Sequence, residues 1–253
     1  MKNLTPKTEA VINLSAIIVV IVINYAIAAG WLGEMTQKAV SALYQTAITP
    51  AGFTFAIWGV IYAALLASAV YFLSNFKNKA IADEIKQHSL YLRVMLGLNI
   101  LWNLTFSYQW IGLSVLIILA YWACLLKLCF LSLKGSHRIL SFAHGLHAGW
   151  IAVASVVNIA AWLVQIKWSG FGIDPMIGYY LGLIIVMIVG ASLSLKLKPC
   201  GAMPLAIVWA MIGIYSATSS SSSSGLIPTF NIVGIVLFLL IAGWNISHNF
   251  KKA

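Results

Sequence analysis

Eight predominantly apolar stretches, each long enough to cross a lipid bilayer, occupy most of this 253-residue chain. They cover residues 10–31, 52–75, 90–108, 110–132, 139–165, 176–195, 200–217 and 229–248. A helix of about 20 apolar residues spans the hydrocarbon core and satisfies its own backbone hydrogen bonds. Only 8% of the residues are charged, against about 25% in soluble domains. The sequence therefore predicts an all-α polytopic membrane protein with about eight transmembrane helices, and it excludes a soluble fold.

Positive charge is distributed unevenly between the two sides of this predicted bundle. Of the 15 Lys and Arg residues, Lys38 and Lys167 fall on one side. The others fall on the opposite side, and they are Lys2, Lys7, Lys77, Lys79, Lys86, Arg93, Lys127, Lys134, Arg138, Lys196, Lys198, Lys251 and Lys252. Cytoplasmic loops of membrane proteins are enriched in Lys and Arg. We therefore expect an inner or plasma membrane protein with both termini in the cytoplasm, and we attribute the net charge of +10 to topology rather than to a nucleic-acid partner.

The connections between the spans differ in character. Residues 33–50 form a long polar segment on the side with few cations, and long connections of this kind often cover binding sites. Residues 75–89 are expected to form a solvated cytoplasmic linker, and a tight turn is expected near residues 107–109. The serine run at 219–224 is typical of a flexible spacer.

The chain offers little for acid–base or metal chemistry. All five carboxylates lie in loops or at the ends of spans, and they are Glu9, Glu34, Asp83, Glu84 and Asp174. Proton-coupled transporters place ionisable groups inside the bundle, and hydrolases use paired carboxylates. The three cysteines have no metal-type spacing. His144 and His147 lie near the cytoplasmic end of their predicted helix and are expected to be interfacial or hydrogen-bonded. We therefore expect no catalytic residues and no metal site.

Aromatic and amide side chains form stripes on three of the predicted helices. In residues 52–75 the stripe is Phe55, Trp58 and Tyr62; in 90–108 it is Asn99, Trp102, Asn103 and Phe106; in 139–165 it is His147, Trp150, Ala154, Asn158 and Trp162. Spacings of three and four place each set on one helix face. The stripes have two interpretations: helix–helix packing in a membrane core, or the wall of a cavity for a ligand.

The same residues carry a family resemblance. Residues 48–62 (ITPAGFTFAIWGVIY), then Leu98–Trp102 with Phe106, then Trp150–Ala154 with Asn158 and Trp162, resemble in order and spacing the TspO/translocator proteins, also called tryptophan-rich sensory proteins. The resemblance covers about residues 10–168. The chain departs from the family pattern in this segment. Ala51 and Phe53 stand where the family usually has Pro and Trp, and the Pro usually found just before Trp58 is missing, with one residue fewer between Phe55 and Trp58.

The resemblance implies a five-helix core over residues 1–168, with three additional transmembrane helices over 169–253. It implies a cavity beneath the 33–50 segment that binds a flat hydrophobic molecule such as a porphyrin or a sterol. A porphyrin or haem-like molecule would be a ligand, and no cofactor is firmly implied. The ligand-binding residues expected on this basis are Pro50, Phe53, Phe55, Trp58, Tyr62, Asn99, Trp102, Phe106, Trp150, Ala154, Asn158 and Trp162. The tryptophans would stack on the ligand and the two asparagines would bond to its polar edge.

Three further possibilities stay open at this point. The first is a small-molecule transporter, for which the only sign is a faint echo between residues 55–62 and 205–215. The second is turnover of a bound porphyrin, which has been suggested for some relatives, although we expect no enzyme. The third is a homodimer.

Overall fold

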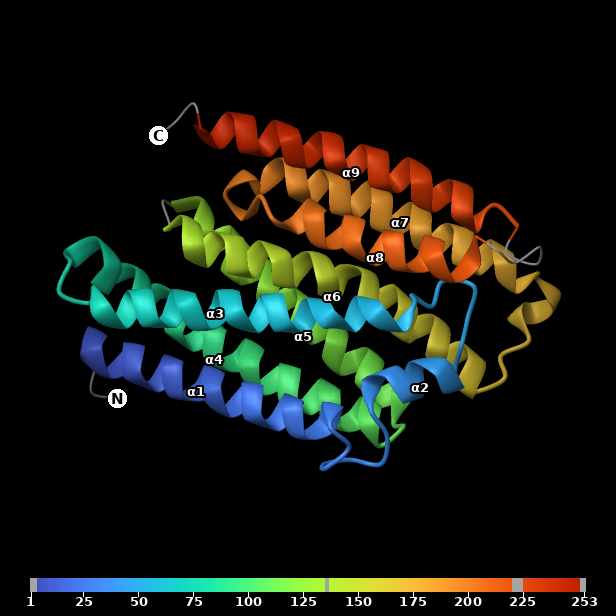
Figure 1. Cartoon of the computed structure of the whole chain (residues 1–253), viewed down its shortest axis with the longest axis horizontal. Helices are drawn as coiled ribbons and strands as arrows, with labels where there is room; N and C mark the ends of the chain where they lie inside the picture. Colours follow the sequence, from blue (N-terminus) through green and yellow to red (C-terminus); the bar gives the residue numbers. More distant parts are fainter. Residues whose placement is uncertain (1–3, 135–136, 220–224, 251–253) are drawn as a thin grey trace.

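The structure, a computed structural model, describes residues 4–134, 137–219 and 225–250 (Figure 1). Within these residues the chain forms nine α-helices and no β-strand. The α-helices are α1 (Pro6–Ala28), α2 (Gln37–Leu43), α3 (Ile57–Ser74), α4 (Lys79–Ser107), α5 (Ile111–Leu131), α6 (Arg138–Gln165), α7 (Pro175–Lys196), α8 (Met203–Thr218) and α9 (Ile227–Phe250). Short 3-10 helices are η1 (Gly52–Ala56), η2 (Ser132–Lys134), η3 (Gly170–Gly172) and η4 (Lys198–Cys200). Most of the serine run, residues 220–224, lies outside the described part.

Each of the eight expected spans corresponds to one long helix, and α2 is an additional short helix in the 33–50 segment. Six helical segments are long and apolar enough to cross a membrane, which makes the chain an integral membrane protein. The two remaining long helices differ from these six in composition or length. Helix α4 carries charged and amide residues, and α8 has only 16 residues.

The expectation of a solvated linker over residues 75–89 is confirmed for residues 75–78 and is wrong from Lys79 onward. Asn78 accepts hydrogen bonds from the backbone of Ala80 and Ile81 and so caps α4, which begins at Lys79. Ile81 and Ile85 are buried, one helical turn apart, in a small apolar cluster with Ala10, Phe72 and Leu140. The charged residues in this segment had suggested a loop. Asp83 and Lys86 occupy the exposed face of a helix whose other face is buried.

Helix α6 occupies the centre of the assembly. It packs against α3 and α5 on one side and against α7 and α8 on the other, while α1 packs against α3 and α4. Figure 1 shows α9 along the outer side of α7 and α8, and it shows the start of α1 and the end of α9 at the same end of the bundle. The five earlier long helices and the last three therefore meet along α6. The division at residue 168 stays a prediction.

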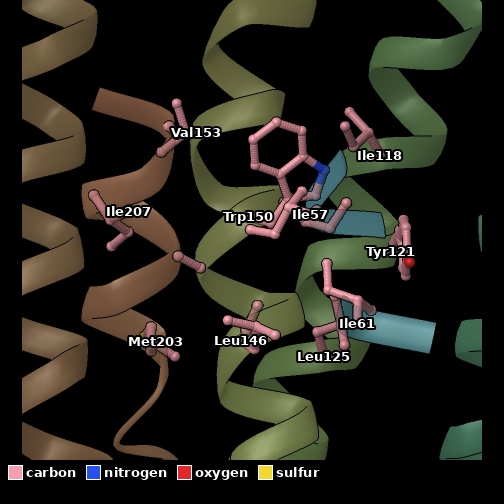
Figure 2. Packing of buried hydrophobic residues seen from close by; sticks show 14 of the residues in the cluster. Ile57, Ile61, Ile118, Tyr121, Leu125, Leu146, Trp150, Val153, Met203 and Ile207 are labelled. Carbon is pink, nitrogen blue, oxygen red and sulfur yellow. The ribbon is translucent and has the colours of Figure 1, made fainter. Parts of the chain in front are cut away.

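One apolar core connects all nine α-helices. It includes Ile17, Val40, Ile57, Met95, Ile118, Trp150, Leu183, Ile207 and Phe238, one from each helix. Figure 2 shows part of it, with Trp150 turned toward Ile57 of α3 and with Met203 and Ile207 of α8 beside α6. Large apolar side chains such as Leu116, Ile188 and Leu240 lie exposed on the outside. A lipid-facing surface accounts for this exposure.

Two glycines of α6 allow α8 and η4 to approach closely. A Cβ atom at Gly145 would lie 2.5 Å from the Cys200 carbonyl oxygen, and one at Gly149 would overlap the Met203 carbonyl oxygen. The spacing of four residues between the glycines is the pattern that permits backbones of membrane helices to touch. The contact holds the C-terminal helices against the centre of the bundle.

Candidate functional site

A pocket with about 580 Å³ of space not filled by atoms, part of it open to the outside, lies between α2, η1, α4, α6 and α8. Its wall consists of Ser41, Tyr44, Thr49, Pro50, Phe55, Trp102, Phe106, Trp150, Val153, Ala154, Val157, Asn158, Ala161 and Ala210. Ligand pockets in proteins combine apolar walls with a few polar groups. This lining has that composition, because its polar side chains are hydroxyls and one amide.

Seven of the twelve residues expected from the sequence line this one pocket. They are Pro50, Phe55, Trp102, Phe106, Trp150, Ala154 and Asn158. Trp102 stacks on Phe106 with a ring-centroid distance of 5.5 Å, and Phe55 meets Trp150 edge to face at 6.2 Å. These contacts place aromatic faces from η1, α4 and α6 around one space.

Asn158 is held in place by its neighbours while it lines the pocket. Its side-chain oxygen accepts a hydrogen bond from Trp102 Nε1 at 2.8 Å, and its Nδ2 donates to Ser114 Oγ of α5 at 3.0 Å. Two residues with expected ligand contacts, Trp102 and Asn158, are thus bonded to each other. The bond fixes the orientation of both side chains.

Trp58 and Tyr62 lie behind the pocket wall. The Trp58 ring stacks on Tyr62 at 5.4 Å and contacts Trp102, Trp150 and His147 at 6.1, 6.3 and 5.6 Å. Helix α3 itself contributes no side chain to the lining, and the wall on that side comes from Pro50 and η1. Trp58 therefore supports the tryptophans that line the pocket.

Phe53, Asn99 and Trp162 point elsewhere. Phe53 is 47% exposed and meets Trp209 of α8 edge to face. Trp162 covers Gly112 of α5, where a Cβ atom would lie 2.8 Å from its Nε1. Asn99 is fully buried and belongs to a network of polar side chains between helices.

This polar network joins α1, α4, α5 and α6. Asn24 Nδ2 donates to Asn99 Oδ1 at 2.7 Å, and Asn99 Nδ2 donates to the Tyr121 hydroxyl at 2.8 Å. That hydroxyl bonds to Nε2 of His147, and Asn103 bonds to Asn24. Gln37 of α2 bonds to Asn103. We call these six residues the polar network. The network holds the helices together beside the pocket, and the hydrogen bonds of the Asn99 side chain go to other protein residues.

The two histidines of α6 are buried inside the bundle. His144 and His147 have no exposed surface, and the expected hydrogen bonding is confirmed for His147, whose Nε2 bonds to the Tyr121 hydroxyl. Among the described residues no group of three His, Cys, Asp or Glu side chains is arranged to hold a metal ion. His147 instead joins the polar network and contacts the Trp58 ring.

Several lining residues were missed by sequence reasoning. Ser41, Tyr44 and Thr49 come from the 33–50 segment, which was expected to cover the cavity but not to contribute named residues. Helical spacing on α6 could have found three others. Val153, Val157 and Ala161 each lie three residues after a named residue of the stripe and so share its face. Ala210 had no signal, since it belongs to a helix outside the resemblance.

Helix α8 fastens the segment that leads into α3. Trp209 Nε1 donates to the Thr54 carbonyl oxygen at 2.9 Å, and the backbone nitrogen of Ala51 donates to the Gly213 carbonyl oxygen at 3.0 Å. A Cβ atom at Gly213 would overlap the side chain of Thr54. The last three helices therefore hold one wall of the pocket in place.

Comparison with known proteins gives one family. A family model described as "TSPO-like protein" matches residues 10–244, which include six of the eight long helices in full and most of α1 and α9. No curated protein and no solved structure matches the chain.

Proposed function

Because the chain belongs to the TSPO-like protein family, we propose that it is a membrane receptor for a flat hydrophobic ligand such as a porphyrin or a sterol. The observation that carries the proposal is the convergence of seven sequence-selected residues, from η1, α4 and α6 and the segment before them, on one pocket. Aromatic walls suit a flat apolar ligand, because ring faces bury large areas without leaving polar atoms unpaired.

Two buried donors beside the pocket support a ligand with a polar edge. Within the described part of the chain, Nε1 of Trp58 and Nε1 of Trp150 are buried without a hydrogen-bond partner. Buried N–H groups are normally paired. A ligand carrying carbonyl or carboxylate oxygens would supply the acceptor that Trp150 lacks, whereas Asn99 would keep its bonds to Asn24 and Tyr121.

The proposal is one of binding rather than turnover or transport. The polar side chains of the lining are the hydroxyls of Ser41, Tyr44 and Thr49 and the amide of Asn158, which suit orientation of a ligand. Under illumination in air, the absorption spectrum of the bound porphyrin is therefore expected to stay unchanged. Loss of the porphyrin absorption band would indicate turnover instead.

Filling the pocket should abolish binding. We expect Ala154→Phe to reduce the quenching of tryptophan fluorescence by added protoporphyrin at least tenfold, because the new ring occupies the space between α4 and α6. The matched control is Ala152→Phe, which lies on the same helix but outside the lining. This variant should bind as the wild type does. Equal quenching in the wild type and Ala154→Phe, with melting temperatures unchanged, would remove this pocket as the binding site.

We also propose that both termini face the cytoplasm of an inner or plasma membrane. The charge distribution supports this orientation, since Lys38 and Lys167 are the two cations on the opposite side. In intact cells, a membrane-impermeant maleimide should label Ser169→Cys and leave Lys77→Cys unlabelled, with the wild type as the blank. Both positions are exposed in loops. The reverse labelling pattern would invert the topology.

A further inference from the structure

A second pocket lies at the opposite end of the bundle from the first. It lies between α1, α3, α4 and α6, and about 420 Å³ of space there is not filled by atoms, part of it open to the outside. Its lining residues are Ala10, Asn13, Ile17, Leu65, Ser68, Ala69, Phe72, Glu84, Ile85, His88, Leu92 and Leu140, and every one of them is buried. The pocket takes residues from the first turns of α1, α4 and α6 and from the last turns of α3. The first pocket draws on the other ends of α4 and α6.

The second pocket occupies the gap between two apolar clusters. Phe72, Ile85 and Leu140 belong to the small cluster near the chain ends, while Ile17 and Leu65 belong to the main core. Side chains within each cluster pack against one another. Between them the wall turns polar, with Asn13 and Glu84 on facing helices.

The polar atoms that this wall leaves available are hydrogen-bond acceptors. Asn13 is 7% exposed, and its Oδ1 is buried with no partner among the described residues. Its Nδ2 is used, because it donates to Ser89 Oγ at 2.8 Å. Glu84 adds a buried carboxylate, the one acidic side chain of the lining.

The donors on this wall already have acceptors. Ser68 Oγ donates to the Ala64 carbonyl oxygen at 2.7 Å. The His88 ring nitrogen Nδ1 lies 2.9 Å from the Glu84 carbonyl oxygen, so Nδ1 carries the proton of that bond. The pocket thus pairs apolar walls with acceptors and one negative charge.

The Glu84 carboxylate has capacity for another donor. His137 supplies its partners, through Nδ1 at 2.7 Å and the backbone nitrogen at 3.2 Å. A carboxylate offers about four lone-pair sites. The His137 side chain is 31% exposed and lies outside the lining, so it contacts the carboxylate from the solvent side.

We propose that this pocket is a second binding site, for a small apolar molecule that carries a protonated amine. The ammonium group donates to Asn13 Oδ1 and to the Glu84 carboxylate, and the apolar body packs between Phe72, Leu65 and Leu92. Hydrogen bonds between charged partners are about twice as strong as neutral ones. A cation is therefore preferred over a neutral alcohol of the same shape.

The test uses the purified full-length protein in detergent and ¹⁹F NMR of 4-fluorobenzylamine and 4-fluorobenzyl alcohol, with protein-free micelles as background. We expect the amine to bind at least about tenfold more tightly than the alcohol. Glu84→Gln should remove that preference. Glu9→Gln is the matched control, because Glu9 pairs with Arg93 at 2.8 Å outside the lining, and it should bind the amine as the wild type does.

A third variant keeps the test decisive if Glu84→Gln does not fold. Ala69→Leu fills the pocket without touching a polar group and should abolish binding of the amine, while Ala154→Phe in the first pocket should leave it unchanged. Absence of amine binding in the wild type, or equal amine affinity in the wild type, Glu84→Gln and Ala69→Leu, would overturn the proposal.

Discussion

Gly149→Leu is expected to destabilise the protein by about 3 kcal/mol, the upper part of the range for overpacked cores. The added side chain meets the Met203 carbonyl oxygen, and Ala206 Cβ lies 3.0 Å from the new Cβ. A backbone carbonyl yields less readily than the end of a flexible side chain, so α8 has to move away from α6. The measurement is the free energy of unfolding of the solubilised protein in a titration with sodium dodecyl sulfate.

Gly97→Leu is the matched control for this substitution. Gly97 also lies within a long helix, but a Cβ atom there meets nothing within 4 Å. Replacing Gly in a helix by a better helix former does not destabilise an exposed position. A similar loss of stability in both variants would show that the close contact between α6 and α8 is not the cause.

Asn99→Leu is expected to lower the free energy of unfolding by about 2 kcal/mol. Hydrogen bonds within membrane bundles contribute on average about 0.6 kcal/mol, with a maximum near 1.7. Asn99 makes two of them at 2.7 and 2.8 Å, and its loss leaves Asn24 Nδ2 with only the carbonyl of its own helix turn. The loss of Asn99 also leaves buried polar groups of the network short of hydrogen-bond partners, which adds to the loss of stability.

A double-mutant cycle separates the bond from general repacking. Asn99→Leu and Tyr121→Phe remove opposite ends of one hydrogen bond. The loss of stability in the double mutant should therefore be about 1 kcal/mol smaller than the sum of the losses in the two single mutants. Asn75→Leu is the exposed control, because the Asn75 side chain donates to the Tyr71 carbonyl of the adjacent helix turn and to no other described residue, and it should change stability little. Strict additivity in the cycle would contradict a coupled network.

The helices could be predicted from the sequence because membrane helices are long apolar runs. The prediction was wrong over residues 79–89, where charged residues resembled a loop. What the sequence does not show there is the partner surface: Ile81 and Ile85 form a buried face only once Phe72 and Leu140 lie against them. Contacts between segments distant in the chain therefore decide whether these residues form a buried helix, and local composition carries no information on such contacts.

The pocket was predicted in part because helical spacing places residues on one face, and helical geometry also accounts for the misses. A step of four residues turns a helix by about 40° beyond a full turn. Two such steps beyond Ala154 carry Trp162 about 80° around α6 and toward Gly112. On α4, Asn99 and Trp102 are separated by about 60°, so Trp102 faces the pocket and Asn99 faces Asn24 and Tyr121.

The bond between Trp209 and Thr54 also sets an order of events during synthesis. The two residues are 155 positions apart in the chain. At about 5 to 20 residues per second, roughly 8 to 30 s pass between the appearance of Thr54 and that of Trp209. During that interval the segment before α3 has none of its bonds to α8. The first pocket is therefore finished only when the penultimate helix has been inserted, and a chain that stops after α6 would carry this pocket with one wall unfastened.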